Sequence, residues 1–455
     1  MASFISVPQT YASLLGAEDI PSAMLPSNQS KMIPCATNLK SVRTSSASVG
    51  PSATALFQIQ TGAGTGYMKA GSAYLRGQLV LTASGAGAGT WRFSGPREGI
   101  ATGTGEGLNK GIHSASALVS RLTVSNGTQQ LSQLTNYNVY HDILLAHGAS
   151  SDYCLNDSSV YEFTGITRNV AAAPTANETT INFTIPLISP VWSGQQAVPL
   201  FLLNAPLSVE VLTNSIADAF VVATTAITNY SLNNLEICYE EIAVSPELKQ
   251  SIMNRLAQGA VWKQYMDSVY SIQTSADNGA SFNIGIGVSS CKGVVGVDRN
   301  PSAIGIGFTG DFMLNGFSNL RVLYDGKLQN SFDLTTDATV YAELNRTLHS
   351  MFDSDKTSCL AKNPSPAVGN TPWYDFNISK FVYGVSSQCV NDSSIGFSGE
   401  PVQMVTMNHF NATAANSSAY PYVGESWVAG RQRIYFIFYD ELLTIDANGS
   451  CALVR

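Results

Sequence analysis

Adjacent carboxylates are the residues of this sequence that come nearest to a catalytic pair. They occur twice, as Glu240-Glu241 and as Asp440-Glu441. Two carboxyl groups facing each other could serve as general acid and general base, as in glycosidases. Both pairs lie in stretches with the alternating pattern of β-strands, where neighbouring side chains point to opposite faces. We therefore interpret them as solvated strand ends, while a pair assembled from two distant strands stays open.

Glycine-rich stretches raise the second possibility, a phosphate-binding loop. They are TGAGTG at 61–66, SGAGAG at 84–89 and TGTGEG at 102–107. None has the spacing G-x-x-x-x-G-K-[ST] or G-x-G-x-x-G, in which backbone amides at a helix N-terminus hold phosphate. Each stretch also lies between expected strands. The pattern favours flexible inter-strand loops.

The remaining reactive side chains are scattered. No G-x-S-x-G nucleophile motif is present. The histidines are His113, His141, His147, His349 and His409. The cysteines are Cys35, Cys154, Cys238, Cys291, Cys359, Cys389 and Cys451, with no C-x-x-C pair and no zinc-site spacing. The sequence therefore predicts no catalytic residue, no cofactor-binding residue and no metal ligand. It predicts reduced or buried thiols, and leaves a Cys359–Cys389 disulfide open.

Tryptophans could form a carbohydrate-binding groove. They are Trp91, Trp192, Trp262, Trp373 and Trp427. Core and interface packing explains such residues equally well, because a large ring buries much apolar area wherever it lies. Both interpretations stay open at this point.

Composition narrows the class of protein. Only 12% of the 455 residues are charged, against a usual share of about a quarter, and the net charge is -8. An acidic, charge-poor chain argues against direct nucleic-acid binding, which needs a basic face. A low charge density suits large protein–protein contacts. The N-terminus lacks the pattern of a signal peptide, and no run of about 20 apolar residues predicts a transmembrane helix.

Alternating hydrophobicity predicts strands in both halves of the chain. Residues 1–55 are expected to form an irregular arm. The expected strands include 73–81, 118–124, 181–187, 207–211 and 235–239 in the first half, and 282–288, 292–297, 320–324 and 402–407 in the second. The stretch 433–439 is almost continuously apolar, which is typical of a central strand buried on both faces.

Two helices are expected among these strands. In 131–147, Leu131, Leu134, Ile143 and Leu144 have a spacing that suits a short helix. A second helix is expected from Ser245, with serine as N-cap and proline at the first helical position. The resulting organisation is an N-terminal arm over 1–55, a β unit over 56–244, a linker helix over 245–260 and a second β unit over 261–455.

Several phrases resemble the double jelly-roll major capsid proteins of icosahedral double-stranded DNA viruses, including those of virophages, polinton-like viruses and related phages. They occur in the family's order along most of residues 70–449. The phrases are SALVSRLTV with TQQLSQLTNYNVYHDILL at 116–145, FTIPLISPVW at 183–192 with VPLFLLNAPLSVEVLTN at 198–214, FNIGIGVSSCKGVVGVDRN at 282–300 after the helix at Ser245, and IYFIFYDELLTIDANG at 434–449.

The resemblance implies an all-β fold of two tandem eight-stranded jelly-roll sandwiches joined by a short helix. It implies a non-enzymatic homotrimer of pseudo-hexameric outline that tiles an icosahedral capsid, is located in the virion and is assembled inside the host cell. Expected partners are neighbouring capsomers, penton proteins and minor or cement capsid proteins. Residues 1–55 are expected to lock neighbouring trimers or to contact an internal membrane or a minor protein, and no sequence-specific nucleic-acid binding is expected.

Two other classes of protein share these sequence features. A trimeric viral spike or fibre, or a carbohydrate-binding β-sandwich protein, would have a similar composition and tryptophan content. An enzyme on a β-sandwich scaffold comes third, because it needs a cleft in which titratable groups converge. Assembly discriminates these classes, since a capsid protein forms trimers and then sheets or shells, whereas a lectin binds glycans as a smaller species.

Overall fold

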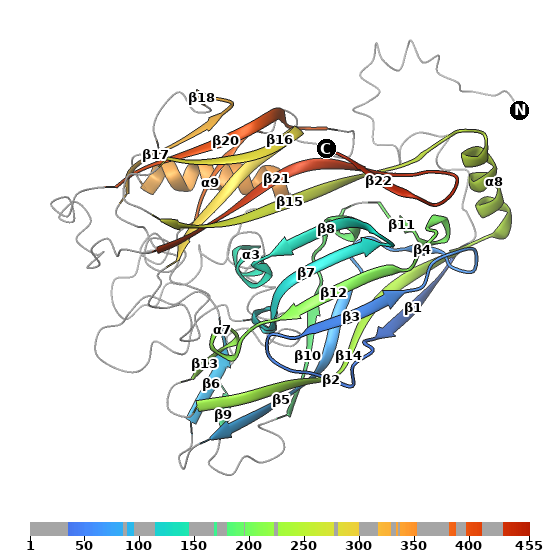
Figure 1. Ribbon diagram of the computed structural model, residues 1–455, viewed down its shortest axis with the longest axis horizontal. Coiled ribbons are helices and arrows are strands. Elements are labelled where there is room, and N and C mark those ends of the chain that lie inside the picture. The colour runs from blue at the N-terminus through green and yellow to red at the C-terminus, as the bar shows by residue number, and fades with distance from the viewer. Residues whose placement is uncertain are drawn as a thin grey trace, which may run out of the picture.

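The structure is a computed structural model, and it describes residues 35–84, 89–94, 114–144, 168–170, 180–194, 196–222, 226–276, 281–299, 317–328, 334, 337–352, 382–387, 397–411 and 431–455. Figure 1 shows two β units, with helix α8 at the turn from one to the other. The first unit contains strands β1–β14, and the second unit contains strands β15–β22. No helix in the described ranges is long and apolar enough to cross a membrane.

The first unit is built from three sheets. A seven-stranded sheet has the order β10-β5-β14-β4-β11, with β1 and β2 also paired to β14, and two smaller sheets have the orders β3-β12-β7-β8 and β13-β6-β9. The strands are β1 (Cys35–Arg43), β2 (Ser48–Val49), β3 (Thr54–Ile59), β4 (Tyr67–Met68), β5 (Tyr74–Ser84), β6 (Gly89–Phe93), β7 (Val119–Asn126), β8 (Gln129–Thr135), β9 (Arg168–Val170), β10 (Thr180–Pro186), β11 (Val198–Pro199), β12 (Leu207–Thr213), β13 (Phe220–Val222) and β14 (Ala226–Val244).

Alternation of apolar and polar residues positions these strands. Along β12, Leu207, Val209 and Val211 are buried while the residues between them are half-buried. The inward residues of the two larger sheets belong to one hydrophobic cluster, in which Phe57 and Ile237 are fully buried. Each sheet thus buries one face against the other, which is the arrangement of a sandwich.

The prediction that residues 1–55 are irregular is wrong for part of that range. Strand β1 pairs with β14 from Cys35↔Val244 to Arg43↔Glu236, and β2 and β3 follow before residue 60. Strand β1 could not be predicted from hydrophobic alternation, because it lies at the sheet surface and has no apolar face. Its Leu39 is 63% exposed. Residues 1–34 lie outside the described residues.

The helix expected over 131–147 is shorter than predicted. Residues 129–135 form strand β8, in which Leu131 and Leu134 are buried, and helix α3 covers only Tyr137–Ile143. Asn136 separates the two elements with a left-handed φ of 53°, a conformation that asparagine adopts more readily than most residues. The apolar spacing at 131 and 134 therefore belonged to a strand that runs directly into a helix.

The helix predicted from Ser245 is confirmed. Helix α8 covers Pro246–Ala257, and the Ser245 side chain accepts a hydrogen bond from the Leu248 backbone N–H at 3.4 Å. Leu256 is its only buried residue. This helix is therefore held mainly by its cap and its two flanking strands rather than by burial of a broad apolar face.

The second unit centres on one eight-stranded sheet. Its order is β15-β21-β16-β20-β17-β18, with β19 paired to β16 and β22 paired to β21. The strands are β15 (Trp262–Ala276), β16 (Ser281–Arg299), β17 (Phe317–Tyr324), β18 (Lys327–Leu328), β19 (Tyr383–Ser386), β20 (Glu400–Asn411), β21 (Arg431–Ile445) and β22 (Cys451–Val454), and helix α9 (Asp337–Phe352) packs on β19. The central position predicted for 433–439 is confirmed, because β21 lies between β15 and β16.

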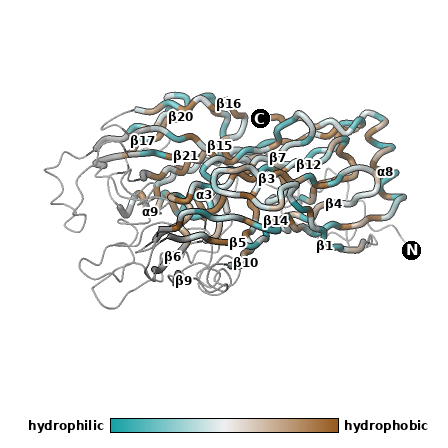
Figure 2. Tube along the Cα trace, turned by 60° about the horizontal axis from the view of Figure 1, so that its bottom comes forward, coloured by the Kyte–Doolittle hydropathy of each residue, from teal (hydrophilic) through white to brown (hydrophobic). Residues whose placement is uncertain are grey.

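The two units are in direct contact. Helix α3 of the first unit lies beside the sheet of the second unit in both views (Figure 1, Figure 2). The ring of Tyr140 lies 5.4 Å from that of Phe436 and 6.2 Å from that of Phe438. Gln264 also donates a hydrogen bond to the Val191 carbonyl oxygen at 2.9 Å. Buried aromatic residues and at least one buried amide thus join the units.

One ion-pair cluster fixes strand β1 to the first unit. The Glu236 side chain on β14 is only 5% exposed, and it accepts hydrogen bonds from Arg76 Nη2 at 2.6 Å and from Arg43 Nε at 2.5 Å. Arg76 lies on β5 and Arg43 on β1, so one carboxylate joins three adjacent strands. The hydrogen bond from Arg76, followed by that from Arg43, lowers the pKa of Glu236 below its ordinary value of 4.5.

This cluster predicts a stability loss in acid. Because the folded pKa of Glu236 lies below the unfolded one, its contribution is fully present above the unfolded value near 4.5 and disappears as the pH falls through the folded value. The difference in unfolding free energy between the wild type and Glu236→Gln should therefore shrink over that interval, as followed by urea denaturation. Glu240→Gln, which removes an exposed ion pair with Lys69, is the matched control and should change stability little at any pH.

Candidate functional site

The carboxylates singled out from the sequence divide into one exposed and three buried groups. Glu240 forms an ion pair with Lys69 at 2.7 Å and its side chain is 37% exposed, as predicted for a solvated strand end. That prediction is wrong for Glu241, Asp440 and Glu441, which are 7%, 2% and 1% exposed. Burying a carboxylate is costly unless it is paired and hydrogen-bonded, so each of these three groups needs partners close to it.

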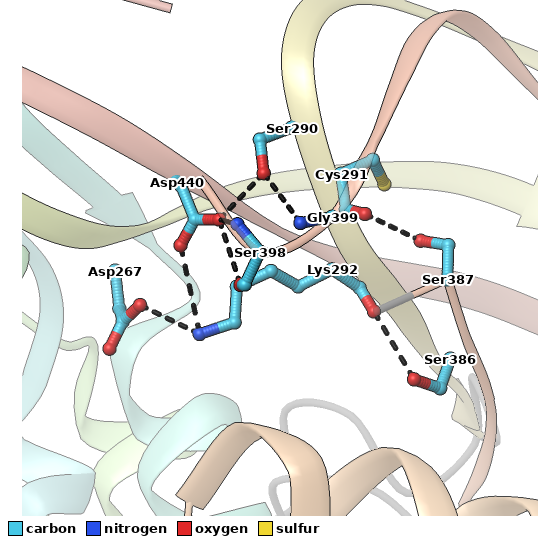
Figure 3. A network of polar contacts seen from close by, with 9 residues as sticks. All are labelled: Asp267, Ser290, Cys291, Lys292, Ser386, Ser387, Ser398, Gly399 and Asp440. Carbon is cyan, nitrogen blue, oxygen red and sulfur yellow. Dashed lines mark hydrogen bonds and ion pairs between the residues drawn. The ribbon is translucent and has the colours of Figure 1, made fainter. Parts of the chain in front are cut away.

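Asp440 on β21 is the centre of the polar network shown in Figure 3. Its Oδ2 atom accepts hydrogen bonds from Ser290 Oγ at 2.6 Å, from the Ser398 backbone N–H at 2.6 Å and from Ser398 Oγ at 2.9 Å. Ser290 lies on β16, and Ser398 lies just before β20. Three donors on one oxygen compensate for the loss of water at this carboxylate.

Lys292 forms the other side of this network. Its Nζ atom lies 2.7 Å from Asp267 Oδ1 and 3.8 Å from Asp440 Oδ1, and its side chain is 3% exposed. Asp267 on β15 and Asp440 on β21 are directly opposite in the strand pairing, where two like charges repel each other. The ammonium group lies between them and removes that repulsion.

A β-bulge directs Lys292 to this position. The pairing of β16 with β21 shifts register between Cys291 and Gly293, so Lys292 is the extra residue, and a bulge re-aims the side chain it carries. The Ser398–Gly399 segment also approaches closely, because a Cβ on Gly399 would lie 2.0 Å from the Cys291 carbonyl oxygen. The Gly399 N–H donates to Ser290 Oγ at 2.7 Å. Bulge and glycine together bring three strands around one carboxylate.

Glu441 lies at the boundary between the two units. It accepts a hydrogen bond from Ser268 Oγ at 2.6 Å and from Arg455 Nε at 2.7 Å. The cavity beside it has a volume of about 300 Å³ and is lined by β8 residues such as Gln130 and by β15 residues such as Ser271. Ser271 also donates to the Thr135 carbonyl oxygen at 2.9 Å. This polar seam joins the units where the aromatic contacts of α3 end.

These arrangements are built for holding strands together. Asp440 and Glu441 have side chains only 3% and 2% exposed, although Glu441 lines the cavity of about 300 Å³. In the described ranges no group of three or more His, Cys, Asp or Glu side chains could hold a metal ion. Their shared chemistry is that of a carboxylate neutralised by a cation and hydroxyl donors.

The glycine-rich stretch at 61–66 forms an inter-strand loop between β3 and β4, as predicted. The Gly66 N–H donates to Glu241 Oε1 at 2.9 Å, so that amide is used by the chain's own carboxylate. A Cβ on Gly66 would lie 2.1 Å from the Ile242 carbonyl oxygen, which explains the glycine by close packing against β14. Residues 85–88 and 102–107 of the other two stretches lie outside the described residues.

Of the histidines, His141 is the one whose side chain is described. It is 2% exposed on α3, with its ring centroid 6.0 Å from that of Tyr137. His349 and His409 lie on α9 and β20, and His113 and His147 lie outside the described residues. The described histidine side chain is thus a packed ring on helix α3.

The described cysteine side chains are free thiols, as the sequence predicted. They are Cys238, Cys291 and Cys451. Burial raises the pKa of Cys291 to about 11 and that of Cys451 to about 11, which keeps both as unreactive thiols at neutral pH. Cys359 and Cys389, the two members of the disulfide left open, lie outside the described residues.

The described tryptophan side chains are packed. Trp192 is fully buried and donates from Nε1 to the Leu187 carbonyl oxygen at 2.8 Å. Trp262 is half-buried, with its ring centroid 6.0 Å from that of Tyr67. Trp373 and Trp427 lie outside the described residues, and only the backbone of Trp91 is described. The packing alternative is therefore correct for Trp192 and Trp262.

Comparison with known proteins identifies the fold. The chain is similar to PBCV-1 VP54, in a structure fitted into a reconstruction of the virophage Sputnik, with a TM-score of 0.59 and 11% identity over 93% of this chain and 98% of that one. It is similar to the Faustovirus major capsid protein, with a TM-score of 0.53 and 11% identity over 94% of each chain. The structure of the Sputnik virophage matches with a TM-score of 0.50 and 10% identity over 92% of this chain and 88% of that one. The sequence matches no family model and no curated protein.

The chain is a double jelly roll. The all-β class and the two tandem sandwiches expected from the sequence are thereby confirmed. In a double jelly roll the two sandwiches stand side by side, so the seam that contains Tyr140, Phe436 and Glu441 is the boundary between rolls. The buried carboxylates lie within this scaffold and at that boundary.

The glycine of the 61–66 loop gives a direct test of the packing explanation. Gly66→Ala places a methyl group against the Ile242 carbonyl oxygen and should destabilise the double jelly roll by about 1–3 kcal/mol, as overpacking does. Gly64→Ala is the matched control, since a Cβ there meets nothing within 4 Å, and it should shift stability by at most about 0.5 kcal/mol. Denaturant unfolding measures both. Equal effects of the two variants would contradict the packing explanation.

Proposed function

We propose that this chain is a major capsid protein, a structural subunit whose trimers of pseudo-hexameric outline tile an icosahedral viral shell. The observation that carries the proposal is the fold, which is shared over 93% of this chain and 98% of PBCV-1 VP54. It also covers 94% of the Faustovirus major capsid protein. A likeness over 93% of this chain includes both rolls and their boundary.

The physical properties of the molecule support a mechanical role. Long antiparallel strands such as β14 and β21 are paired on both sides, so their backbone hydrogen-bonding groups are not available for uncontrolled association. The charged share of 12% leaves a surface that is cheap to desolvate over large contacts. A rigid body with such a surface is suited to tiling, and the proposed function needs no catalytic residue, cofactor or metal.

The proposed role also gives the protein a location, partners and a division into two rolls. The protein is located in the virion, and its capsid is assembled inside the host cell. Its partners are copies of itself in the trimer and in neighbouring capsomers, together with penton and minor or cement capsid proteins. The first roll, expected from the sequence over 56–244, extends over 35–244 because β1 begins at Cys35. The second roll extends over 261–455, with 245–260 as the linker. Nucleic acid is not bound directly in a sequence-specific way, which the net charge of -8 supports.

Assembly tests the proposal. The purified chain should be a homotrimer by light scattering, and negative-stain electron micrographs at high protein concentration should show sheets or closed shells of capsomers with a six-sided outline. A trimeric spike or fibre would give isolated elongated particles instead. A carbohydrate-binding protein would bind a glycan array as a smaller species. Either of these two results, without sheets or shells, would replace the capsid proposal.

The N-terminal arm has a separate role in this proposal. Because β1 begins at Cys35, the arm assigned to 1–55 is reduced to residues 1–34, which we propose lock neighbouring trimers or contact an internal membrane or a minor capsid protein. A chain that starts at Cys35 keeps the β1–β14 pairing and should still form trimers.

Deletion of residues 1–34 should therefore leave the trimer intact and weaken the shell. Light scattering checks the trimer, and the fraction of closed particles that survive dilution checks the shell. A control chain keeps the length of the arm but has its sequence scrambled, and it should behave like the deletion. Shells of normal yield and stability from the deleted chain would contradict the proposal for the arm.

A further inference from the structure

The network around Asp440 places an amine, an acid and a second carboxylate in one buried site. Lys292 Nζ lies 3.8 Å from Asp440 Oδ1, one of the two oxygens bonded to the Cγ atom that an amine would attack. The same Nζ donates a hydrogen bond to Asp267 Oδ1 at 2.7 Å. Figure 3 shows the ammonium group pointing at both carboxylates. A simple ion pair needs one carboxylate. Lys292 instead faces two, the half-exposed Asp267 and the buried Asp440.

The Asp440 carboxyl group is asymmetric. All three of its hydroxyl and amide donors, from Ser290 and Ser398, are on Oδ2, while Oδ1 faces the lysine. Donors concentrated on one oxygen are what stabilise the negative charge of a tetrahedral intermediate in acyl transfer. Oδ2 is therefore placed as the oxyanion, and Oδ1 as the oxygen that leaves.

We propose that Lys292 and Asp440 join in an intramolecular amide bond, with Asp267 carrying the protons. Nζ attacks Cγ of Asp440, a C–N bond forms, and the C=O electron pair moves to Oδ2. Asp267 accepts protons from Nζ and passes them to Oδ1, so that two of the three ammonium protons leave with Oδ1 as water when the C–Oδ1 bond breaks. Ammonium plus carboxylate gives amide plus water, and no oxidant or further reactant is needed.

The site also explains which carboxylate is joined and why the bond persists. The Asp440 side chain is 3% exposed and that of Asp267 is 46% exposed. The exposed carboxylate exchanges protons with solvent, and the buried one is shielded from water that would hydrolyse the amide. The bond would connect β16 to β21 at the bulge and so fix the central strands covalently. This inference goes beyond the capsid proposal and does not depend on it.

Mass spectrometry of the purified full-length chain tests the bond. The intact mass should be lower than that of the sequence by one water. Trypsin cannot cleave after an acylated Lys292, so the digest should contain residues 264–299 joined to residues 434–455. The full sequence mass, with free peptides 264–292 and 293–299, would overturn the proposal and leave an ion pair. Loss of water within 264–299 alone would also overturn it, because the acceptor would then be Asp267.

Variants separate the roles of the three residues. Lys292→Arg keeps the positive charge but has no amine that forms this bond, so its mass should equal that of its own sequence. Asp267→Asn removes the proton carrier, so most molecules of this variant should lack the amide bond. Circular dichroism should show that the variant is still folded. Lys69→Arg, at the exposed pair with Glu240, is the matched control and should keep the loss of one water. Loss of water in Lys292→Arg equal to that of the wild type would contradict the assignment.

Discussion

The burial of strand β21 is the constraint on which much of this structure depends. The strand pairs with β15, β16 and β22, and the residues from Ile434 to Glu441 are all buried. A strand enclosed on both faces is normally apolar throughout, yet this one carries Asp440 and Glu441 in sequence. Because adjacent residues on a strand face opposite ways, each carboxylate needs its own set of donors. Asp440 obtains them within the second roll, and Glu441 obtains them from β15 and the chain end at Arg455.

Much of the fold could be predicted from the sequence because periodicity records which face is buried. The alternation in 207–211 and the apolar run in 433–439 became strands β12 and β21, and the Ser245-Pro246 pair became the start of α8. Hydrophobic periodicity did not predict the structure where a strand is held by something other than a buried apolar face. Strand β1 is held by backbone pairing and by Glu236 rather than by an apolar face, so its sequence reads as polar and irregular. At 131–135 the apolar residues fit the spacing of a strand and that of a helix equally well. Only Asn136, with its left-handed φ, separates strand β8 from helix α3.

The buried polar groups could be located in the sequence only as acidic residues, without their surroundings. Asp440 and Glu441 were read as solvated because an isolated carboxylate is far more often exposed than buried. Asp440 is surrounded by Ser290, Lys292 and Ser398, and Glu441 is bound by Ser268 and Arg455. These partners are remote in the chain and follow no motif spacing. The β-bulge that directs Lys292 is a feature of the pairing between two strands. A pattern within one strand does not encode it, so sequence reasoning had no signal for this network.

The boundary between the rolls shows how such polar groups contribute to a rigid subunit. Aromatic contacts such as Tyr140 with Phe436 supply burial without fixing a register, since apolar surfaces tolerate small displacements. Directional bonds such as Gln264 to the Val191 carbonyl oxygen and Ser271 to the Thr135 carbonyl oxygen fix the register, because an unmatched buried donor or acceptor is costly. A sliding displacement of one roll along the other would break both bonds at once. The two hydrogen bonds therefore hold the rolls in one register, as the proposed role of a capsid subunit requires.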